Sequence, residues 1–219
     1  MRIGRDRVVV IGGGIAGLAT ALRLAPMPVT LLVHAPLGTE ASTPWAQGGI
    51  AAAIGADDAP SLHAADTLSA GAGLTDLSVA TRVAQAAPGC IEYLESLAAP
   101  FDRDPAGRLL LGLEAAHSRR RIVHAGGDST GKLVIETLIG AVQRAPHIEV
   151  QEGMRATELV REDGVVVGVR AVGPSGLPSF LSARAVVLAT GGVGGLFSDT
   201  TNPLGSTGSG LALAARAGA

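Results

Sequence analysis

The sequence is poor in cysteine, aromatic residues and charge, and each shortage excludes a class of function. A single cysteine, Cys90, can form neither an intrachain disulfide nor, alone, a zinc site, and we expect a reduced, cytoplasmic setting. Aromatic residues make up 2% of the chain, so platforms that stack nucleic-acid bases are nearly absent. The net charge of −2 gives no electrostatic basis for binding nucleic acid.

Long apolar runs are also missing, and no window approaches the roughly 18 apolar residues of a membrane span. We therefore expect no membrane segment. Arg2, Arg5 and Arg7 precede an apolar stretch, as in a signal peptide. The glycines inside that stretch are typical of a dinucleotide-binding turn, so we interpret the stretch as part of the fold and not as a signal peptide. With 47% apolar and 16% charged residues, the chain is expected to be globular.

Glycine is abundant, at 31 of 219 residues, and forms one informative turn near the N-terminus. Four β-branched residues at 8–11 predict a buried parallel strand. Gly12, Gly14 and Gly17 follow with G-x-G-x-x-G spacing. In a dinucleotide fold they permit the tight turn, the approach of a pyrophosphate, and close helix–strand packing. The flanking strand and helix favour dinucleotide binding; the alternative is a tight turn without a ligand.

The remaining pattern predicts an α/β fold in which an antiparallel β-meander is inserted between parallel strands. Further parallel strands are expected at 29–33 and 185–189, and a short strand at 148–151. The meander is expected at 158–161, 165–172 and 179–183, with a turn at Asp163-Gly164. Capping residues, prolines and glycines predict helices at about 14–25, 60–71, 76–87, 88–97, 130–144 and 208–217.

Helical spacing also predicts which side chains are buried. Cys90 recurs with Ile91 and Leu94, so we expect it in the core. Thr130 is expected to cap the helix that follows it. That helix should bury Leu133, Val134, Leu138 and Val142.

Three stretches could carry chemistry. The second strand ends in Val33-His34 without the carboxylate that commonly binds a ribose, so His34 is either an adenosine contact or a solvated residue. Loop 39–51 offers hydroxyls, glycines, an amide and Trp45, which suit a flat heteroaromatic ring or a plain surface loop. Residues 114–124 hold three arginines, which could bind a small dicarboxylate or form a solvated basic loop.

These residues together resemble the N-terminal part of the L-aspartate oxidase family, FAD enzymes grouped with the succinate dehydrogenase and fumarate reductase flavoproteins. The matching motifs follow the family's order at 12–17, 42–51, 66–73, 117–125, 189–192 and 200–203. The resemblance implies a Rossmann-like FAD-binding domain over residues 1–219. It also implies that the family's capping domain, the rest of its FAD domain and its main catalytic residues lie beyond Ala219.

Carried over by position, the resemblance assigns a substrate contact and a set of FAD contacts. Glu114 would lie near the substrate's amino group. Ser42 stands where covalent flavoproteins of the group carry histidine, so the FAD should be bound non-covalently. No metal site is expected. The FAD contacts would be Gly12, Gly13, Gly14, Ile15, Ala16, Gly17, His34, Ser42, Thr43, Pro44, Trp45, Ala46, Gln47, Gly48, Gly49, Arg155, Ala156, Thr190, Gly191 and Ser209.

The implied reaction is oxidation of L-aspartate to iminoaspartate, the first step of bacterial NAD synthesis through quinolinate, with reoxidation by oxygen or fumarate. The implied substrate is thus a small dicarboxylate, and quinolinate synthase is a candidate partner. Two alternatives stay open: a fumarate reductase or succinate dehydrogenase-like flavoprotein, and a non-catalytic FAD-binding module.

Three positions depart from the family pattern. Leu113-Glu114-Ala115-Ala116 stands where Arg-Glu-Gly-Gly is common, Gly208-Ser209-Gly210 replaces Gly-Asp-Gly, and His34 replaces a lysine.

Overall fold

A computed structural model describes residues 6–219, so Arg2 and Arg5 lie outside the described residues. The chain divides into two compact units. The first extends to Trp45 and resumes with residues 138–219, and the second consists of residues 46–137. Among residues 6–219, no helix combines the length and the apolar character needed to cross a membrane.

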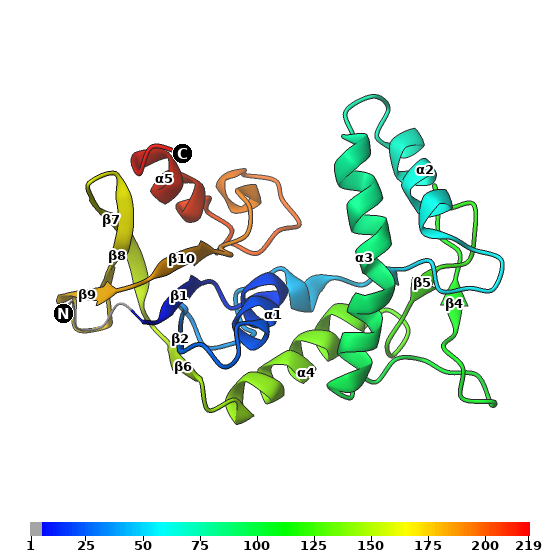
Figure 1. Cartoon of the computed structure of the whole chain (residues 1–219), viewed down its shortest axis with the longest axis horizontal. Coiled ribbons are helices and arrows are strands. Elements are labelled where there is room, and N and C mark those ends of the chain that lie inside the picture. The colour runs from blue at the N-terminus through cyan, green and yellow to red at the C-terminus, as the bar shows by residue number, and fades with distance from the viewer. Residues whose placement is uncertain (1–5) are drawn as a thin grey trace. The chain divides into compact units, whose positions relative to one another are not determined.

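The first unit is built on a parallel sheet in the order β10-β1-β2-β6. Its strands are β1 (Val8–Ile11), β2 (Val29–Leu32), β6 (Ile148–Gln151) and β10 (Ala185–Leu188) (Figure 1). β1 and β2 are buried at every position, and their sequences are apolar except for the buried Thr30 of β2. The predicted parallel sheet is therefore confirmed, with β6 as an additional member.

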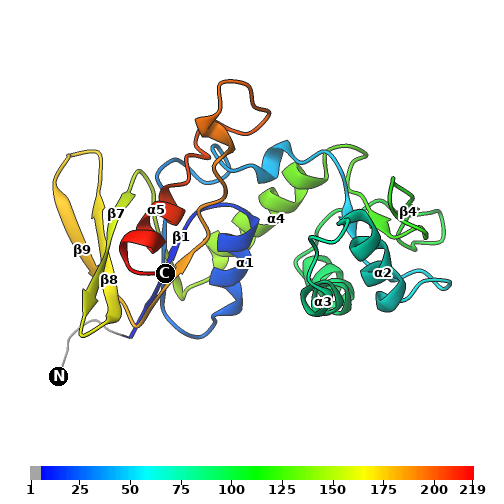
Figure 2. The ribbon, with the colours of Figure 1, turned by 90° about the horizontal axis from the view of Figure 1, so that it is seen from above.

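The predicted meander is also confirmed, as β7 (Arg155–Glu162), β8 (Val165–Val172) and β9 (Pro178–Ser182). Val169 and Ala171 of β8 share one buried cluster with Val9 and Ile11 of the parallel sheet. Helix α1 (Ile15–Arg23) lies on the other side of β1 from the meander, as Figure 2 shows, and its Leu18 is buried. The first unit also contains the short helices η1 (Thr43–Trp45) and η2 (Gly194–Leu196) and the helix α5 (Ser209–Arg216).

The second unit pairs two helices with a small antiparallel sheet. Helices α2 (Pro60–Ala70) and α3 (Leu77–Ser96) pack against each other (Figure 1). The sheet has the order β3-β5-β4 and consists of β3 (Ile50–Ala51), β4 (Leu111–Gly112) and β5 (Ile122–Val123). Helix α4 (Thr130–Arg144) begins in the second unit and ends in the first. Two-residue strands are too short for a detectable alternation, and the sequence did not predict this sheet.

One prediction in this unit is wrong: residues 76–87 and 88–97 form the single helix α3, with Pro88 inside it. Asp76 does cap the helix, since its carboxylate accepts a hydrogen bond from the Val79 backbone N–H. Proline removes a helical donor at Pro88. The buried stripe nevertheless continues across it through Ala80, Ala84, Ile91 and Leu94, and this packing keeps the helix continuous.

Two side-chain predictions are also wrong. Cys90 is exposed, because it lies beside the buried stripe of α3 and not within it. Thr130 is the first residue of α4 and does not act as its cap; its buried hydroxyl accepts a hydrogen bond from the Ala125 backbone N–H at 3.1 Å. Within α4, Val134, Leu138 and Val142 are buried as predicted, while Leu133 is half-buried.

Candidate functional site

Of the three motif glycines, Gly12 and Gly14 stand in the turn between β1 and α1, and Gly17 lies in the first turn of α1. Packing requires glycine at two of these positions. A Cβ atom at Gly12 would overlap the carbonyl oxygen of Ala189, and Gly12 has a φ of +121°. A Cβ atom at Gly17 would overlap the carbonyl oxygen of Gly12. At Gly14 the nearest atoms would be Thr43 Oγ1 at 3.5 Å and the Ala41 Cβ at 3.6 Å, which are ordinary contacts. The protein itself therefore gives no packing reason for glycine at position 14.

This turn borders a cavity of about 770 Å³ in the first unit. Most of the predicted cofactor contacts line it, although they come from six separate segments of the sequence. They are Gly12, Gly13, Gly14, Ile15, Ala16, His34, Ser42, Thr43, Arg155, Ala156, Thr190, Gly191 and Ser209. Gly17 is buried in α1, and Pro44 and Trp45 continue the loop beyond the lining residues. The remaining predicted contacts, residues 46–49, belong to the second unit.

The cavity suits a dinucleotide in size and in polarity. Its volume falls within the range of about 300–1,000 Å³ that is usual for ligand sites. The N-cap of α1 is Gly14, which has no side chain to cap the helix. The first backbone N–H groups of a helix lack acceptors inside the helix and attract anions. Gly14 thus leaves the space that a pyrophosphate requires at a helix N-terminus, where the N–H of Ile15 already donates to Thr43 Oγ1.

A short contact between a histidine and a carboxylate lies where the second strand leads into the cavity. His34 Nε2 is 2.5 Å from Glu40 Oε2, and both residues line the cavity. The sequence did not predict a role for Glu40, because the carboxylate of a dinucleotide fold is expected at the end of the second strand. A loop residue six positions after His34 brings an acid to this place instead.

Loop 42–45 is fastened to the glycine turn by a side chain. Thr43 Oγ1 accepts a hydrogen bond from the backbone N–H of Ile15 at 3.1 Å. Ser42 Oγ lies 3.4 Å from Ser206 Oγ, which holds the loop to a segment 164 residues away in the sequence. Trp45 is 62% exposed, so it does not serve as a core residue.

The first residues of α5 also line the cavity, because they pack closely against the turn at Thr190. Gly208, the N-cap, has a φ of +71°, which favours glycine. A Cβ atom at Gly210 would collide with the Thr190 side chain, so glycine lets α5 approach the Thr190-Gly191 turn. Ser209 consequently lines the cavity, at the position where the related pattern has an acid.

In the second unit, Glu114 lies beside the glycines of loop 46–49. A Cβ atom at Gly48 would be 3.9 Å from both carboxylate oxygens of Glu114. His124 Nε2 is 3.6 Å from Glu114 Oε1. The side chain of Glu114 is 49% exposed, so the carboxylate can receive a ligand. A Cβ atom at Gly49 would collide with the carbonyl of Val123, so this loop is held tightly against β5.

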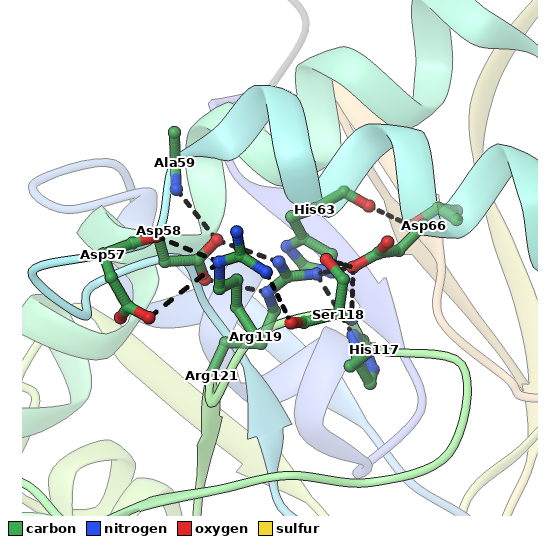
Figure 3. Close-up of polar contacts among 10 residues, drawn as sticks. Asp57, Asp58, Ala59, His63, Asp66, His117, Ser118, Arg119 and Arg121 are labelled. Atoms are coloured by element: carbon green, nitrogen blue, oxygen red, sulfur yellow. Dashed lines mark hydrogen bonds and ion pairs between the residues drawn. The ribbon is translucent and has the colours of Figure 1, made fainter.

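Arg121, one of the three arginines proposed as carboxylate ligands, is fully buried and bound to the protein's own carboxylates (Figure 3). Its Nε and Nη2 atoms donate to the two oxygens of Asp58, both at 2.8 Å. Its Nη1 atom donates to Asp66 Oδ2 at 2.6 Å. The prediction of a free dicarboxylate-binding cluster is therefore wrong for Arg121. This residue fixes the loop that carries Glu114 to the start of α2.

The same network shifts the pKa values of its acids. Asp66 Oδ2 accepts the backbone N–H and the hydroxyl of Ser118, each at 2.8 Å. These bonds, the backbone one foremost, together with Arg121, lower the pKa of Asp66 from 3.8 to about 2. Burial opposes this at Asp58, but the hydrogen bonds from Arg121 and Ala59 lower its pKa on balance.

His63 on α2 borders this network without joining it. Its Nδ1 atom is buried and has no hydrogen-bond partner, and its ring centre lies 5.6 Å from that of His117. Burial, followed by the charge of Arg121, lowers the pKa of His63. The ring is therefore held neutral at physiological pH. No cluster of His, Cys, Asp and Glu that could hold a metal ion occurs in the described part of the chain.

The comparison with known families supports a dinucleotide as the ligand of the cavity. A family model described as "FAD binding domain" matches residues 7–219. The chain belongs to this family of FAD-binding domains. FAD is thus the cofactor of the family, and the cavity's size, its open helix N-terminus and the unfilled space at Gly14 fit it.

The chain is also similar to curated proteins of one named activity. An L-aspartate oxidase of Mesorhizobium japonicum is 59% identical over 96% of this chain, which corresponds to 41% of that protein. An L-aspartate oxidase of Agrobacterium fabrum is 51% identical over 98% of this chain and 41% of its own length. The chain thus spans about two fifths of the length of the curated relatives it matches.

Two solved structures show the same fold. Mycobacterium smegmatis Sdh1 in complex with UQ1 matches with a TM-score of 0.89 and 34% identity, covering 98% of this chain and 39% of that one. A quinol-fumarate reductase with menaquinol molecules matches with a TM-score of 0.90 and 27% identity, covering 98% and 38%. The predicted fold class, a Rossmann-like FAD-binding fold with an inserted meander, is confirmed.

Proposed function

We propose that the protein containing this chain is an L-aspartate oxidase, which oxidises L-aspartate to iminoaspartate with FAD. The observation that carries this proposal is the 59% identity to an L-aspartate oxidase over nearly the whole chain. The two solved structures of the same fold, Sdh1 and the quinol-fumarate reductase, share 34% and 27% sequence identity with the chain. The presence of Glu114 supports the assignment, since a carboxylate suits the recognition of an amino group.

The proposed cofactor contacts follow from the cavity. Residues 12–17 and the N-terminus of α1 would bind the pyrophosphate, and His34, Arg155 and Ala156 would lie by the adenosine. Residues 42–49 would contact the flavin ring, with Thr190, Gly191 and Ser209. FAD, when bound, supplies an acceptor for the hydride of the substrate.

We further propose that the FAD is not covalently attached. Ser42 occupies the position where covalent relatives have histidine, and a serine hydroxyl does not replace an imidazole as the attachment point. Denaturing the purified holoprotein with acid should release all yellow flavin into the supernatant. Flavin that remains with the precipitated protein would contradict this assignment.

For the substrate, Glu114 is proposed to accept hydrogen bonds from the amino group of L-aspartate. The amino acid must give up a proton to leave a neutral amine before its Cα–H bond can break with two electrons. Glu114 would orient the amine. Arg120 is the proposed ligand for a carboxylate of the substrate, because Arg121 is bound by Asp58 and Asp66 and Arg119 is hydrogen-bonded to Asp57 and Ser118.

The test is anaerobic mixing of the FAD-loaded protein, produced from the complete coding sequence, with L-aspartate or succinate. Bleaching of the flavin by L-aspartate and not by succinate is the expected result. Faster bleaching by succinate would favour a succinate dehydrogenase-like flavoprotein, for which the 34% identity to Sdh1 is the supporting observation. Flavin binding with no reduction by either compound would indicate a binding module only.

The choice of electron acceptor is part of the same proposal. Oxygen and fumarate are both predicted to reoxidise the flavin, and parallel assays of peroxide formation and of fumarate consumption would compare them. A cytoplasmic location and an association with quinolinate synthase stay predictions.

A further inference from the structure

The side chains of Glu114 and His124 meet across the small sheet of the second unit. Residue pairing in this sheet sets Gly112 opposite Ile122, and side chains alternate between the faces of a strand. Gly112 and Ile122 therefore share one face, and Glu114 and His124 lie just beyond the ends of β4 and β5. There His124 Nε2 reaches Glu114 Oε1 at 3.6 Å.

Gly112 makes this diagonal contact possible. A Cβ atom at Gly112 would lie 2.8 Å from His124 Nε2, closer than carbon and nitrogen atoms can approach without a shift. The imidazole of His124 thus crosses the strand through the space that a side chain at Gly112 would fill. The glycine between the two residues accounts for the reach of His124 toward Glu114.

The other side of Glu114 faces loop 46–49. Both of its carboxylate oxygens are equally distant from the position of a Cβ atom at Gly48, at 3.9 Å. Among the ion pairs of the described residues, His124 is the partner of Glu114. The carboxylate is therefore held between an imidazole and the backbone of a loop that the proposed function assigns to the flavin.

We propose that His124 is a positioning residue that orients the Glu114 carboxylate and thereby sets the preference for an amino dicarboxylate over a plain dicarboxylate. This inference rests on the proposed function. A glutamate side chain loses much rotational freedom when it binds a ligand, and a partner that holds it beforehand reduces that cost. At 3.6 Å the contact is too long for a strong hydrogen bond, so the carboxylate keeps lone pairs for an amine.

The experiment compares His124→Leu with His124→Gln in the holoenzyme made from the complete coding sequence. Leucine removes the N–H group, whereas the glutamine amide keeps a donor near the position of Nε2. His124→Leu should raise the KM for L-aspartate about tenfold, the size expected when a free glutamate side chain has to be ordered on binding, with a smaller change in kcat. The affinity for succinate, followed by perturbation of the flavin spectrum, should stay unchanged, and His124→Gln should restore the aspartate KM to within about threefold.

Two further variants separate this proposal from the proposed function. Glu114→Gln should lose aspartate selectivity more strongly than His124→Leu, because it removes the charge itself. Gly112→Ala should reproduce the effect of His124→Leu, because it displaces the imidazole.

Selectivity lost in Glu114→Gln but kept in His124→Leu would overturn the role of His124 alone. Equal losses for aspartate and succinate in His124→Leu would show a merely structural role. Wild-type enzyme that is reduced by succinate and not by aspartate would overturn the proposed function as well.

Discussion

Asp58 and Arg121 are joined by two parallel hydrogen bonds of 2.8 Å, and neither side chain has any surface exposed to solvent. The planar guanidinium matches the two oxygens of the carboxylate. Asp66 binds the remaining Nη1 atom at 2.6 Å. Removal of one member of such a buried set leaves another charge without compensation, which is far more costly than the loss of an exposed pair.

The neighbouring aspartates 57 and 58 give a matched test of this difference. Asp58→Ala should lower the free energy of unfolding by about 3–5 kcal/mol, because Arg121 would stay buried with half of its partners missing. Asp57→Ala should change it by less than about 0.5 kcal/mol, since Asp57 is 79% exposed and 3.9 Å from Arg119. Urea denaturation of the two variants measures both values. Similar losses in the two variants would show that burial of Arg121 is not what stabilises this loop.

The lowered pKa of Asp66 predicts how acid affects stability. An unfolded chain takes up this proton near pH 3.8, while the folded chain resists it until about pH 2. The stabilisation is therefore fully present above pH 3.8 and is lost as the pH falls toward 2. In Asp66→Asn this contribution is absent, so the free energy of unfolding should vary less steeply with pH across that interval. Acid titrations of both proteins in urea, with Asp57→Asn as the exposed control, measure the slopes, and equal slopes for Asp66→Asn and wild type would contradict the prediction.

His63 predicts a separate, milder effect at higher pH. Burial lowers its pKa below 6.5, so the unfolded chain binds this proton more readily than the folded one. Stability should consequently begin to fall as the pH drops below 6.5. His63→Gln should remove this decline in stability below pH 6.5. It should leave unchanged the second decline, below pH 3.8, which comes from Asp66. Thermal unfolding followed at closely spaced pH values separates the two phases.

Features that depend on neighbouring residues could be predicted from the sequence, and features that depend on distant ones could not. The turn at Gly12 follows from an adjacent strand and helix, and the meander follows from Asp163-Gly164 between two alternating stretches. Arg121 was grouped with its sequence neighbours as a ligand for substrate. Its actual partners, Asp58 and Asp66, are 63 and 55 residues away in the sequence, and no local sequence pattern predicts contacts over that separation.

Two failures have a more specific cause. Pro88 was interpreted as a helix start because proline is common there, yet the buried stripe of α3 continues across it and outweighs the lost hydrogen bond. The pair of Glu114 and His124 depends on strands of two residues, in which no alternation can be detected. Only the register of those strands reveals that Gly112 separates the pair.

The departure at Ala116 from the glycine of the related pattern has a measurable consequence. Ala116 has a φ of +69°, a left-handed conformation that costs alanine about 1–2 kcal/mol. Ala116→Gly should raise the free energy of unfolding by up to about 1 kcal/mol, after the greater flexibility of glycine in the unfolded chain is subtracted. Ala115→Gly is the matched control and should lower it by about 0.5–1 kcal/mol, because Ala115 is not among the residues with positive φ. Thermal denaturation distinguishes the two, and stabilisation by both or by neither would refute the assignment of strain to position 116.

Gly17 and Gly14 belong to one motif, but packing requires glycine at position 17, whereas the proposed cofactor requires it at position 14. Gly17→Ala should prevent stable folding, because the new Cβ atom would overlap the backbone of Gly12, which cannot move without displacing β1. Gly14→Ala should fold with nearly unchanged stability, since its Cβ atom would make only ordinary contacts at 3.5 and 3.6 Å. The same methyl group would stand where a pyrophosphate approaches the backbone, so the affinity for FAD should fall by at least about tenfold. Circular dichroism and flavin fluorescence titration of both variants provide the test. A Gly14→Ala protein that folds and binds FAD as tightly as the wild type would show that the pyrophosphate lies elsewhere.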